Sequence, residues 1–143
     1  MPSTFAIWMG AARPKTLWAA VAPVAMASAM AWRDGGFDLL TAVVCLVTAM
    51  LLQVGTNFCN DYADFAKGTD TAERPGPVRA TAAGLVSPAA MKRATVLTFG
   101  LAALVSVYLV VRGGWWLAPL MAASIASGIL YLSLIHISEP PRP

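Results

Sequence analysis

The sequence predicts an all-α membrane protein, a polytopic helical bundle with four transmembrane helices. Of its 143 residues, 58% are hydrophobic and only 12% are charged, whereas an average soluble domain is roughly 25% charged. The charged residues leave four uncharged segments of 17, 22, 18 and 23 residues, at positions 16–32, 39–60, 94–111 and 113–135. Because about 20 apolar helical residues cross a hydrocarbon core, each segment reads as a membrane span.

The expected helix boundaries follow from capping residues at the ends of these segments. Ser87 is a suitable N-cap, and Pro88 then occupies the first helical position, where its missing N–H does no harm. Gly113 and Gly114 favour a tight turn into the last span. We therefore expect spans at about residues 16–33, 39–62, 88–111 and 115–131.

The basic residues predict how the bundle is oriented. Arg13 and Lys15 precede the first uncharged segment, and five of the ten basic residues lie between the second and third uncharged segments: Lys67, Arg74, Arg79, Lys92 and Arg93. Because basic residues are retained on the cytoplasmic side, the N-terminus and the 61–93 connection are expected to be cytoplasmic.

Two other classes of protein are disfavoured. The net charge is +3, but the basic residues form no continuous stripe, so nucleic acid is not expected as a partner. The chain has two cysteines, Cys45 and Cys59, both within the second apolar segment. That placement argues against a small secreted domain built on disulfides.

A polar stripe runs along the second span. Steps of four and three residues place Gln53, Asn57, Asp61 and Asp64 on one helical face, with Asn60 beside them. A carboxylate near the middle of a span costs about 2.5 to 3.5 kcal/mol, and the position of the two acids at the cytoplasmic end lowers that cost. The stripe therefore predicts a face directed toward a polar cavity.

The chemistry of the stripe favours a divalent cation. Two carboxylates one turn apart, with carboxamides behind them, are hard oxygen ligands that suit Mg²⁺ together with phosphate oxygens and water. The next loop adds the cations Lys67, Arg74 and Arg79 and a third carboxylate, Asp70. Together they predict a ligand that contains a diphosphate.

A simpler interpretation stays open. The acids from Asp61 to Glu73 could form a solvated helix end that pairs locally with Lys67 and Arg74. That interpretation assigns no role to Gln53 and Asn57 inside the apolar span.

Several motifs resemble one family. Residues 57–64, NFCNDYAD, continuing to KGTD at 67–70, resemble the first aspartate-rich motif of the UbiA superfamily of intramembrane prenyltransferases. The branch that prenylates 1,4-dihydroxy-2-naphthoate in menaquinone synthesis is the most similar. Three further pieces support that branch: RPKTL at 13–17, the Gly68-x-Asp70 ending of the motif and DTAERPGPVR at 70–79. GLVS at 84–87 also fits, and the resemblance covers about residues 5–131.

The resemblance implies a bundle of about nine spans around a central cavity. It implies that Asp61 and Asp64 hold Mg²⁺, with Asp70 as a further candidate ligand. Lys67 and Arg79 would stabilise the leaving diphosphate. The residues implied in substrate binding are Gln53, Asn57, Asn60, Asp70 and Arg74.

The implied reaction is the Mg²⁺-dependent transfer of a polyprenyl group from polyprenyl diphosphate to 1,4-dihydroxy-2-naphthoate, with decarboxylation to demethylmenaquinone. The implied location is the inner (plasma) membrane, with the lipid bilayer as surroundings. Breaking the allylic C–O bond builds charge on the diphosphate, which a metal ion and fixed cations stabilise most in the transition state.

The chain departs from the family pattern near its end. No second aspartate-rich motif follows Asp70, and residues 132–143 resemble translated sequencing-adapter DNA. We therefore expect residues 1–131 to be the N-terminal part of a transmembrane prenyltransferase domain, 132–143 to be a non-native tail, and this 143-residue chain alone to be inactive.

Two other functions remain open from the sequence. The acceptor could be a different aromatic compound, such as 4-hydroxybenzoate. A small membrane transporter could instead use Asp61 and Asp64 as a proton or cation relay. In a transporter, the loop cations would repel the transported ion.

Overall fold

The computed structural model describes the backbone of residues 3–66 and 79–134, and the side chains through residue 130. Every regular element in this part is helical, which confirms the predicted all-α class. The elements are α1 (Thr4–Ala12), the 3₁₀ turn η1 (Pro14–Thr16), α2 (Trp18–Arg33), α3 (Leu39–Ala66), α4 (Pro88–Gly113) and α5 (Leu117–Leu134). Residues 132–134 continue α5, and the rest of the expected tail lies outside the described residues.

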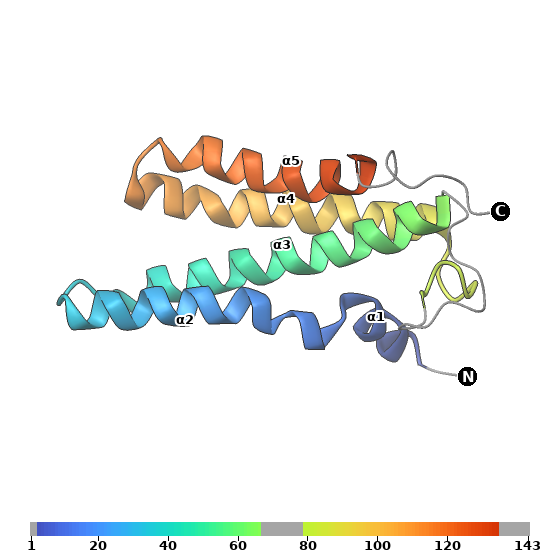
Figure 1. Ribbon diagram of the computed structural model, residues 1–143, viewed down its shortest axis with the longest axis horizontal. Helices are drawn as coiled ribbons and strands as arrows, with labels where there is room; N and C mark the ends of the chain where they lie inside the picture. The colour runs from blue at the N-terminus through green and yellow to red at the C-terminus, as the bar shows by residue number, and fades with distance from the viewer. Residues whose placement is uncertain (1–2, 67–78, 135–143) are drawn as a thin grey trace.

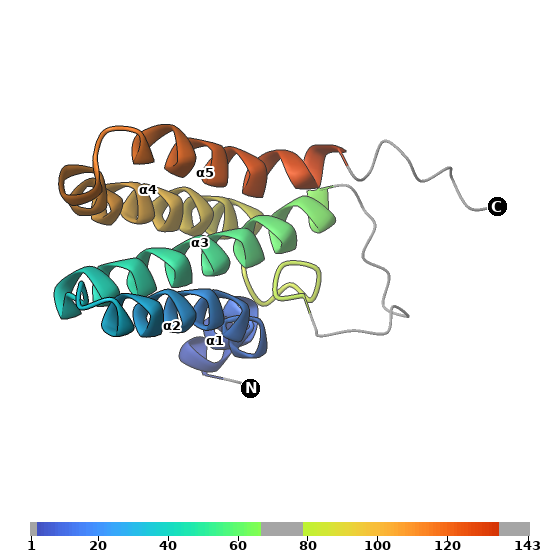
Figure 2. The same cartoon turned by 60° about the vertical axis from the view of Figure 1, so that its left-hand side comes forward.

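The four long helices run side by side, and α3 contacts α1, α2, α4 and α5 (Figure 1, Figure 2). Helix α1 and residues 79–87 lie at the end of the bundle where α3 finishes and α4 begins. The N-terminal helix and the described part of the connection between the second and third expected spans therefore share one end of the bundle.

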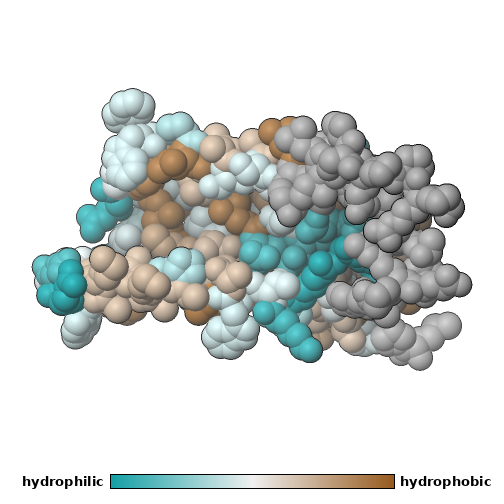
Figure 3. Space-filling model, viewed as in Figure 1, coloured by the Kyte–Doolittle hydropathy of each residue, from teal (hydrophilic) through white to brown (hydrophobic). Residues whose placement is uncertain are grey.

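Two helices, α3 and α4, are long and apolar enough to cross a membrane. Helix α2 has 16 residues, which extend about 24 Å at 1.5 Å per residue, and the apolar part of α5 is Leu117–Leu130. Hydrophilic residues gather toward the two ends of the bundle, with apolar residues between them (Figure 3). Large apolar side chains of α4 are exposed, as expected against lipid: Val96, Leu97, Leu101, Leu104, Val107 and Val111.

The caps confirm the predicted starts and turns. The Ser87 hydroxyl accepts the N–H of Ala90 at 3.2 Å at the start of α4. Gly114 closes that helix with φ 106°, a conformation that favours glycine. At the start of α3, the Asp38 carboxylate accepts the N–H of Thr41 at 2.7 Å. Hydrogen bonds from Thr41, aided by the charge of Arg112, hold the pKa of the Asp38 carboxyl below its ordinary value.

The helices approach closely around the ring of Phe99 on α4, which is 6% exposed. A Cβ added at Gly55 on α3 would lie 2.9 Å from two atoms of this ring. One added at Gly128 on α5 would lie 3.4 Å from the same ring and 3.1 Å from Thr56 Oγ1. The two glycines thus let α3 and α5 pack against one aromatic side chain.

We predict that Gly55→Ala destabilises the bundle by about 1 to 3 kcal/mol, because the new methyl group must displace the Phe99 ring. Gly100→Ala on α4 is the matched control, since an added Cβ there meets no described atom within 4 Å. Thermal unfolding in one detergent compares the variants. Equal melting temperatures for Gly55→Ala and Gly100→Ala would contradict this packing.

An elbow between α1 and α2 is fastened to α3 by Asn57. Its side-chain amide donates to the carbonyl oxygen of Ala12 at 2.8 Å and to Thr16 Oγ1 at 2.9 Å. Thr16 Oγ1 in turn donates to the carbonyl oxygen of Arg13 at 2.9 Å, and Arg13 has a left-handed φ of 53°. Because a non-glycine residue is strained there, these bonds support an unfavourable backbone turn.

We predict that Asn57→Ala loosens the elbow, because two half-buried acceptors lose their donor at a cost of about 1 kcal/mol. Amide hydrogen exchange should become faster in residues 4–16 and stay unchanged in the middle of α4, which is the internal reference. Unchanged exchange in residues 4–16 would show that Asn57 does not hold the elbow.

Candidate functional site

The candidate site lies where the last turns of α3 meet residues 79–86. Asp61 and Asp64 are one helical turn apart on α3, and their exposed fractions are 2% and 5%. Two carboxylates at this level of burial need fixed polar partners, because an unpaired buried charge is strongly unfavourable. Residues 79–81 supply those partners.

The segment that faces the carboxylates folds into a compact turn. The carbonyl oxygen of Ala80 accepts the N–H groups of Leu85 at 2.9 Å and Val86 at 3.1 Å. The N–H of Gly84, at φ 69°, donates to the carbonyl oxygen of Thr81 at 3.0 Å. This turn brings the chain back toward α4 and leaves the N–H groups of Ala80 and Thr81 directed at α3.

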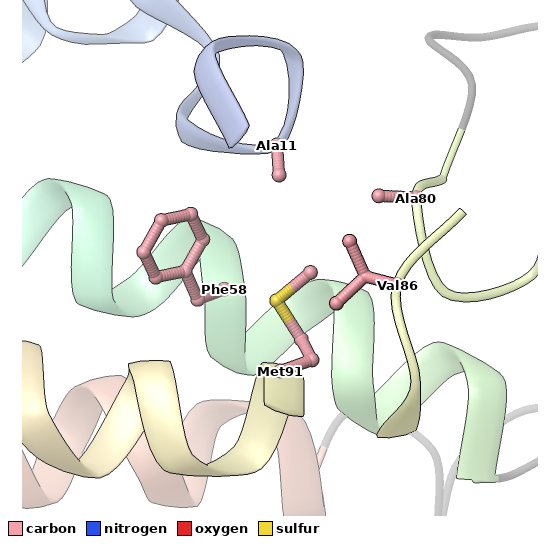
Figure 4. Close-up of a cluster of buried hydrophobic side chains, with 5 residues drawn as sticks. All are labelled: Ala11, Phe58, Ala80, Val86 and Met91. Atoms are coloured by element: carbon pink, nitrogen blue, oxygen red, sulfur yellow. The ribbon is translucent and has the colours of Figure 1, made fainter. Parts of the chain in front are cut away.

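An apolar cluster holds the turn in place from the other side. Ala11 of α1, Phe58 of α3, Ala80 and Val86 of the turn and Met91 of α4 are buried together (Figure 4). The cluster therefore joins four separate parts of the chain beside the carboxylates.

Asp61 accepts two backbone hydrogen bonds, one on each carboxylate oxygen. The N–H of Ala80 donates to Oδ2 at 2.9 Å, and the N–H of Thr81 donates to Oδ1 at 3.0 Å. Both bonds are buried and have an ionisable acceptor, which makes them stronger than bonds between neutral groups. Asp61 thus fixes the backbone of the turn.

Asp64 pairs with Arg79, whose guanidinium forms a salt bridge with the Asp64 carboxylate. The two side chains are largely buried. In such a pair, removal of one partner leaves an uncompensated charge and costs about 3 to 5 kcal/mol. Asp64 thus contacts Arg79, and Asp61 contacts the next two residues of the same segment.

The structure places the sequence-predicted residues in three groups. It brings together Asp61, Asp64 and Arg79. It directs Asn57 to the N-terminal elbow, and it leaves Gln53 and Asn60 half-buried on α3. Three other predicted residues lie outside the described residues: Lys67, Asp70 and Arg74.

Thr81 is a site residue that the sequence did not suggest. It is 2% exposed, and its Oγ1 has no hydrogen-bond partner in the described part of the chain. Its backbone N–H donates to Asp61, so the residue that carries this unused hydroxyl is a direct neighbour of that carboxylate. A threonine in a loop carries no sequence signal for this role, because only the folded turn shows that the hydroxyl is buried.

The donor chemistry fits a divalent cation. Among the described residues, no three His, Cys, Asp or Glu side chains form a metal-binding group. Two carboxylates are nevertheless the number that Mg²⁺ commonly takes from a protein, with water and phosphate oxygens completing its shell. Each oxygen of Asp61 keeps a lone pair after it accepts one N–H. The unpartnered hydroxyl of Thr81 adds another hard oxygen.

Comparisons with known proteins match most of the chain. It is 38% identical over 136 residues to the 1,4-dihydroxy-2-naphthoate octaprenyltransferase of Escherichia coli, covering 95% of this chain and 44% of that protein. The protein of the same name from Mycobacterium tuberculosis is 37% identical over 130 residues, covering 90% of this chain and 44% of that protein. The one from Haemophilus influenzae is 44% identical over 93 residues, covering 64% and 30%.

The chain thus spans less than half the length of these curated relatives. No solved structure matches it. The family model described as the UbiA prenyltransferase family matches residues 20–137, which is most of the sequence. With its apolar helices and its buried acidic pair, the chain belongs to the UbiA prenyltransferase family.

Proposed function

We propose that residues 1–131 form part of a transmembrane domain that transfers a polyprenyl group from polyprenyl diphosphate to 1,4-dihydroxy-2-naphthoate. The names of the relatives support prenyl transfer and the naphthoate acceptor. The observation that carries the proposal is the buried group of Asp61, Asp64 and Arg79 at one end of an apolar bundle. It sets two acids and a cation beside the hydrocarbon region, where a lipid with a charged headgroup would need them.

Asp61 and Asp64 are the proposed ligands of Mg²⁺, with Asp70 as a further ligand. When bound, the ion supplies positive charge that stabilises the departing diphosphate. The burial of the two carboxylates excludes competing water and strengthens electrostatic interactions at this point. Thr81 Oγ1 is available to donate to an oxygen of the diphosphate, because it is buried and has no other partner among the described residues.

Arg79 is the proposed cation that meets the diphosphate as negative charge builds on it. Its guanidinium is held at the site by Asp64 before substrate arrives, so little reorganisation is needed during the reaction. Lys67 and Arg74 are proposed to add charge from the same connection. Gln53, Asn57 and Asn60 are proposed to contribute to the substrate-binding face of α3, and Asn57 does so by holding the elbow.

The proposed reaction breaks the allylic C–O bond, and its electron pair leaves with the diphosphate. A ring carbon of the acceptor forms the new bond to the prenyl group. The ring carboxylate leaves as CO₂, its bonding electrons restore the aromatic ring, and the product is the hydroquinone form, demethylmenaquinol. Burial of the site at the end of the bundle protects the electron-poor prenyl centre from capture by water.

The proposed setting is the inner (plasma) membrane. There, α2 to α5 are four spans of a bundle of about nine. The end that carries α1 and residues 79–87 faces the cytoplasm, in accord with the basic residues near it.

We predict that Asp64→Asn, in the intact prenyltransferase that carries these residues, lowers kcat at least about 100-fold, because charge stabilisation at the diphosphate is lost. Asp38→Asn, at the opposite end of α3, is the matched control and should retain activity. Transfer of labelled prenyl groups to the naphthoate is measured against Mg²⁺ concentration, with membrane insertion checked for each variant. Near-normal turnover of inserted Asp64→Asn would refute the metal site.

The same assay separates the remaining alternatives. Faster prenylation of 4-hydroxybenzoate than of the naphthoate would change the proposed acceptor. Proton-coupled flux through reconstituted protein, without metal-dependent binding of a prenyl diphosphate analogue, would instead support a transporter. The salt bridge between Arg79 and Asp64 disfavours a cation relay, because it sets a fixed positive charge on the relay carboxylate.

A further inference from the structure

We propose that Asp61 is a positioning residue whose carboxylate holds the backbone of residues 80 and 81 against α3 and thereby sets Arg79 on Asp64. The inference rests on the proposed function, because it explains how the cation that meets the diphosphate is placed. It assigns Asp61 a role that precedes binding of any metal ion. In this role, Asp61 acts through Arg79.

The hydrogen bonds to Asp61 are the first support. Ala80 and Thr81 are 3% and 2% exposed, so their N–H groups cannot turn to water. Each N–H has a separate carboxylate oxygen, at 2.9 and 3.0 Å. A bidentate arrangement of this kind fixes the orientation of two consecutive peptide groups as well as their distance from α3.

The spacing of the residues is the second support. Asp61 and Asp64 are one helical turn apart, and Arg79 is bonded directly to Ala80. One turn of α3 therefore contacts three consecutive residues of the segment: Asp64 contacts the Arg79 side chain, and Asp61 contacts the next two peptide N–H groups. Fixing the backbone at Ala80 limits where the Arg79 side chain can reach.

The chemistry of the carboxylate is the third support. Asparagine has the same shape as aspartate but replaces one oxygen with an NH₂ group. In Asp61→Asn, that group would face a peptide N–H, so two donors would meet and one hydrogen bond would be lost. The segment should then detach locally while the apolar cluster around Met91 keeps the fold.

The first experiment measures amide hydrogen exchange in the metal-free 143-residue chain, in detergent with EDTA. Exchange at Ala80 and Thr81 should be slow in the wild type and at least about 10-fold faster in Asp61→Asn. Asp38→Asn is the matched control, because Asp38 also accepts a backbone N–H but at the opposite end of α3. Its exchange at Ala80 and Thr81 should equal that of the wild type.

Two exchange results would overturn the inference: fast exchange at Ala80 and Thr81 in the wild type, or slow exchange retained in Asp61→Asn. These readings need neither substrate nor activity. They therefore stand apart from the outcome of any prenyl-transfer assay.

The second experiment uses the intact prenyltransferase that carries these residues and tests whether the positioning matters for the proposed ligand, with inorganic diphosphate as the probe in EDTA. Removing a negative charge near an anion site should by itself strengthen anion binding. Loss of positioning should instead weaken diphosphate binding at least about 10-fold in Asp61→Asn. The loss of affinity should be similar to that in Arg79→Gln. The double variant should bind no more weakly than either single variant, because both act through one guanidinium.

The outcomes of this experiment separate the two proposals. If the intact enzyme binds no diphosphate, with Mg²⁺ or without it, the proposed function fails, and the exchange result alone decides whether Asp61 positions residues 79–81. If the wild type binds diphosphate but Asp61→Asn binds it equally or more tightly, only the positioning role is overturned. Independent losses that multiply in the double variant would also overturn it.

Discussion

The burial of two carboxylates at the end of α3 is the constraint on which the rest of this structure depends. Asp61 and Asp64 lie almost wholly out of solvent, where an uncompensated negative charge would be strongly unfavourable. Residues 79–81 compensate it with two peptide N–H groups and one guanidinium. The connection between α3 and α4 is therefore ordered around the acids where it approaches them, and the same contacts assemble a candidate site for a charged headgroup.

The packing of the bundle serves this arrangement. Phe99 fits against Gly55 and Gly128, which brings α4 and α5 close to α3. Since α4 begins at Pro88, soon after the turn at 79–86, its packing against α3 also places the end of that turn beside α3. The elbow between α1 and α2, which Asn57 holds, also lies against α3. The polar site thus depends on apolar packing along the span, and a substitution at Gly55 is expected to disturb the site as well.

Much of the fold could be predicted because it follows from local signals. Apolar segment length predicted the helices, and Ser87, Pro88 and Gly114 marked the boundaries that the structure confirms. Helix α3 runs to Ala66, about a turn beyond the expected end of the membrane span near residue 62. The number of membrane spans is harder to predict from the sequence, since the 16 residues of α2 are few for a membrane crossing.

The sequence predicted the charged residues of the candidate site, but it did not predict which groups they contact. Helical spacing identified Asp61 and Asp64, and basic charge identified Arg79, because ionisable side chains are visible in a sequence. The partners of Asp61 are peptide N–H groups, which every residue except proline has, so no pattern marks Ala80 or Thr81. Asn57 belonged to the predicted stripe, but its bonds to the elbow depend on a left-handed turn at Arg13 that no sequence rule indicated.

The most direct test of this account is a nuclear magnetic resonance measurement of the contact between Asp61 and the turn. Protein labelled with ¹⁵N at alanine and threonine and with ¹³C at the aspartate carboxylates would be studied in lipid without metal. The account predicts through-space transfer from the amide nitrogens of Ala80 and Thr81 to the Asp61 carboxylate carbon, and its loss in Asp61→Asn. Absence of that transfer in the wild type, with the Thr41 to Asp38 contact still visible, would contradict it.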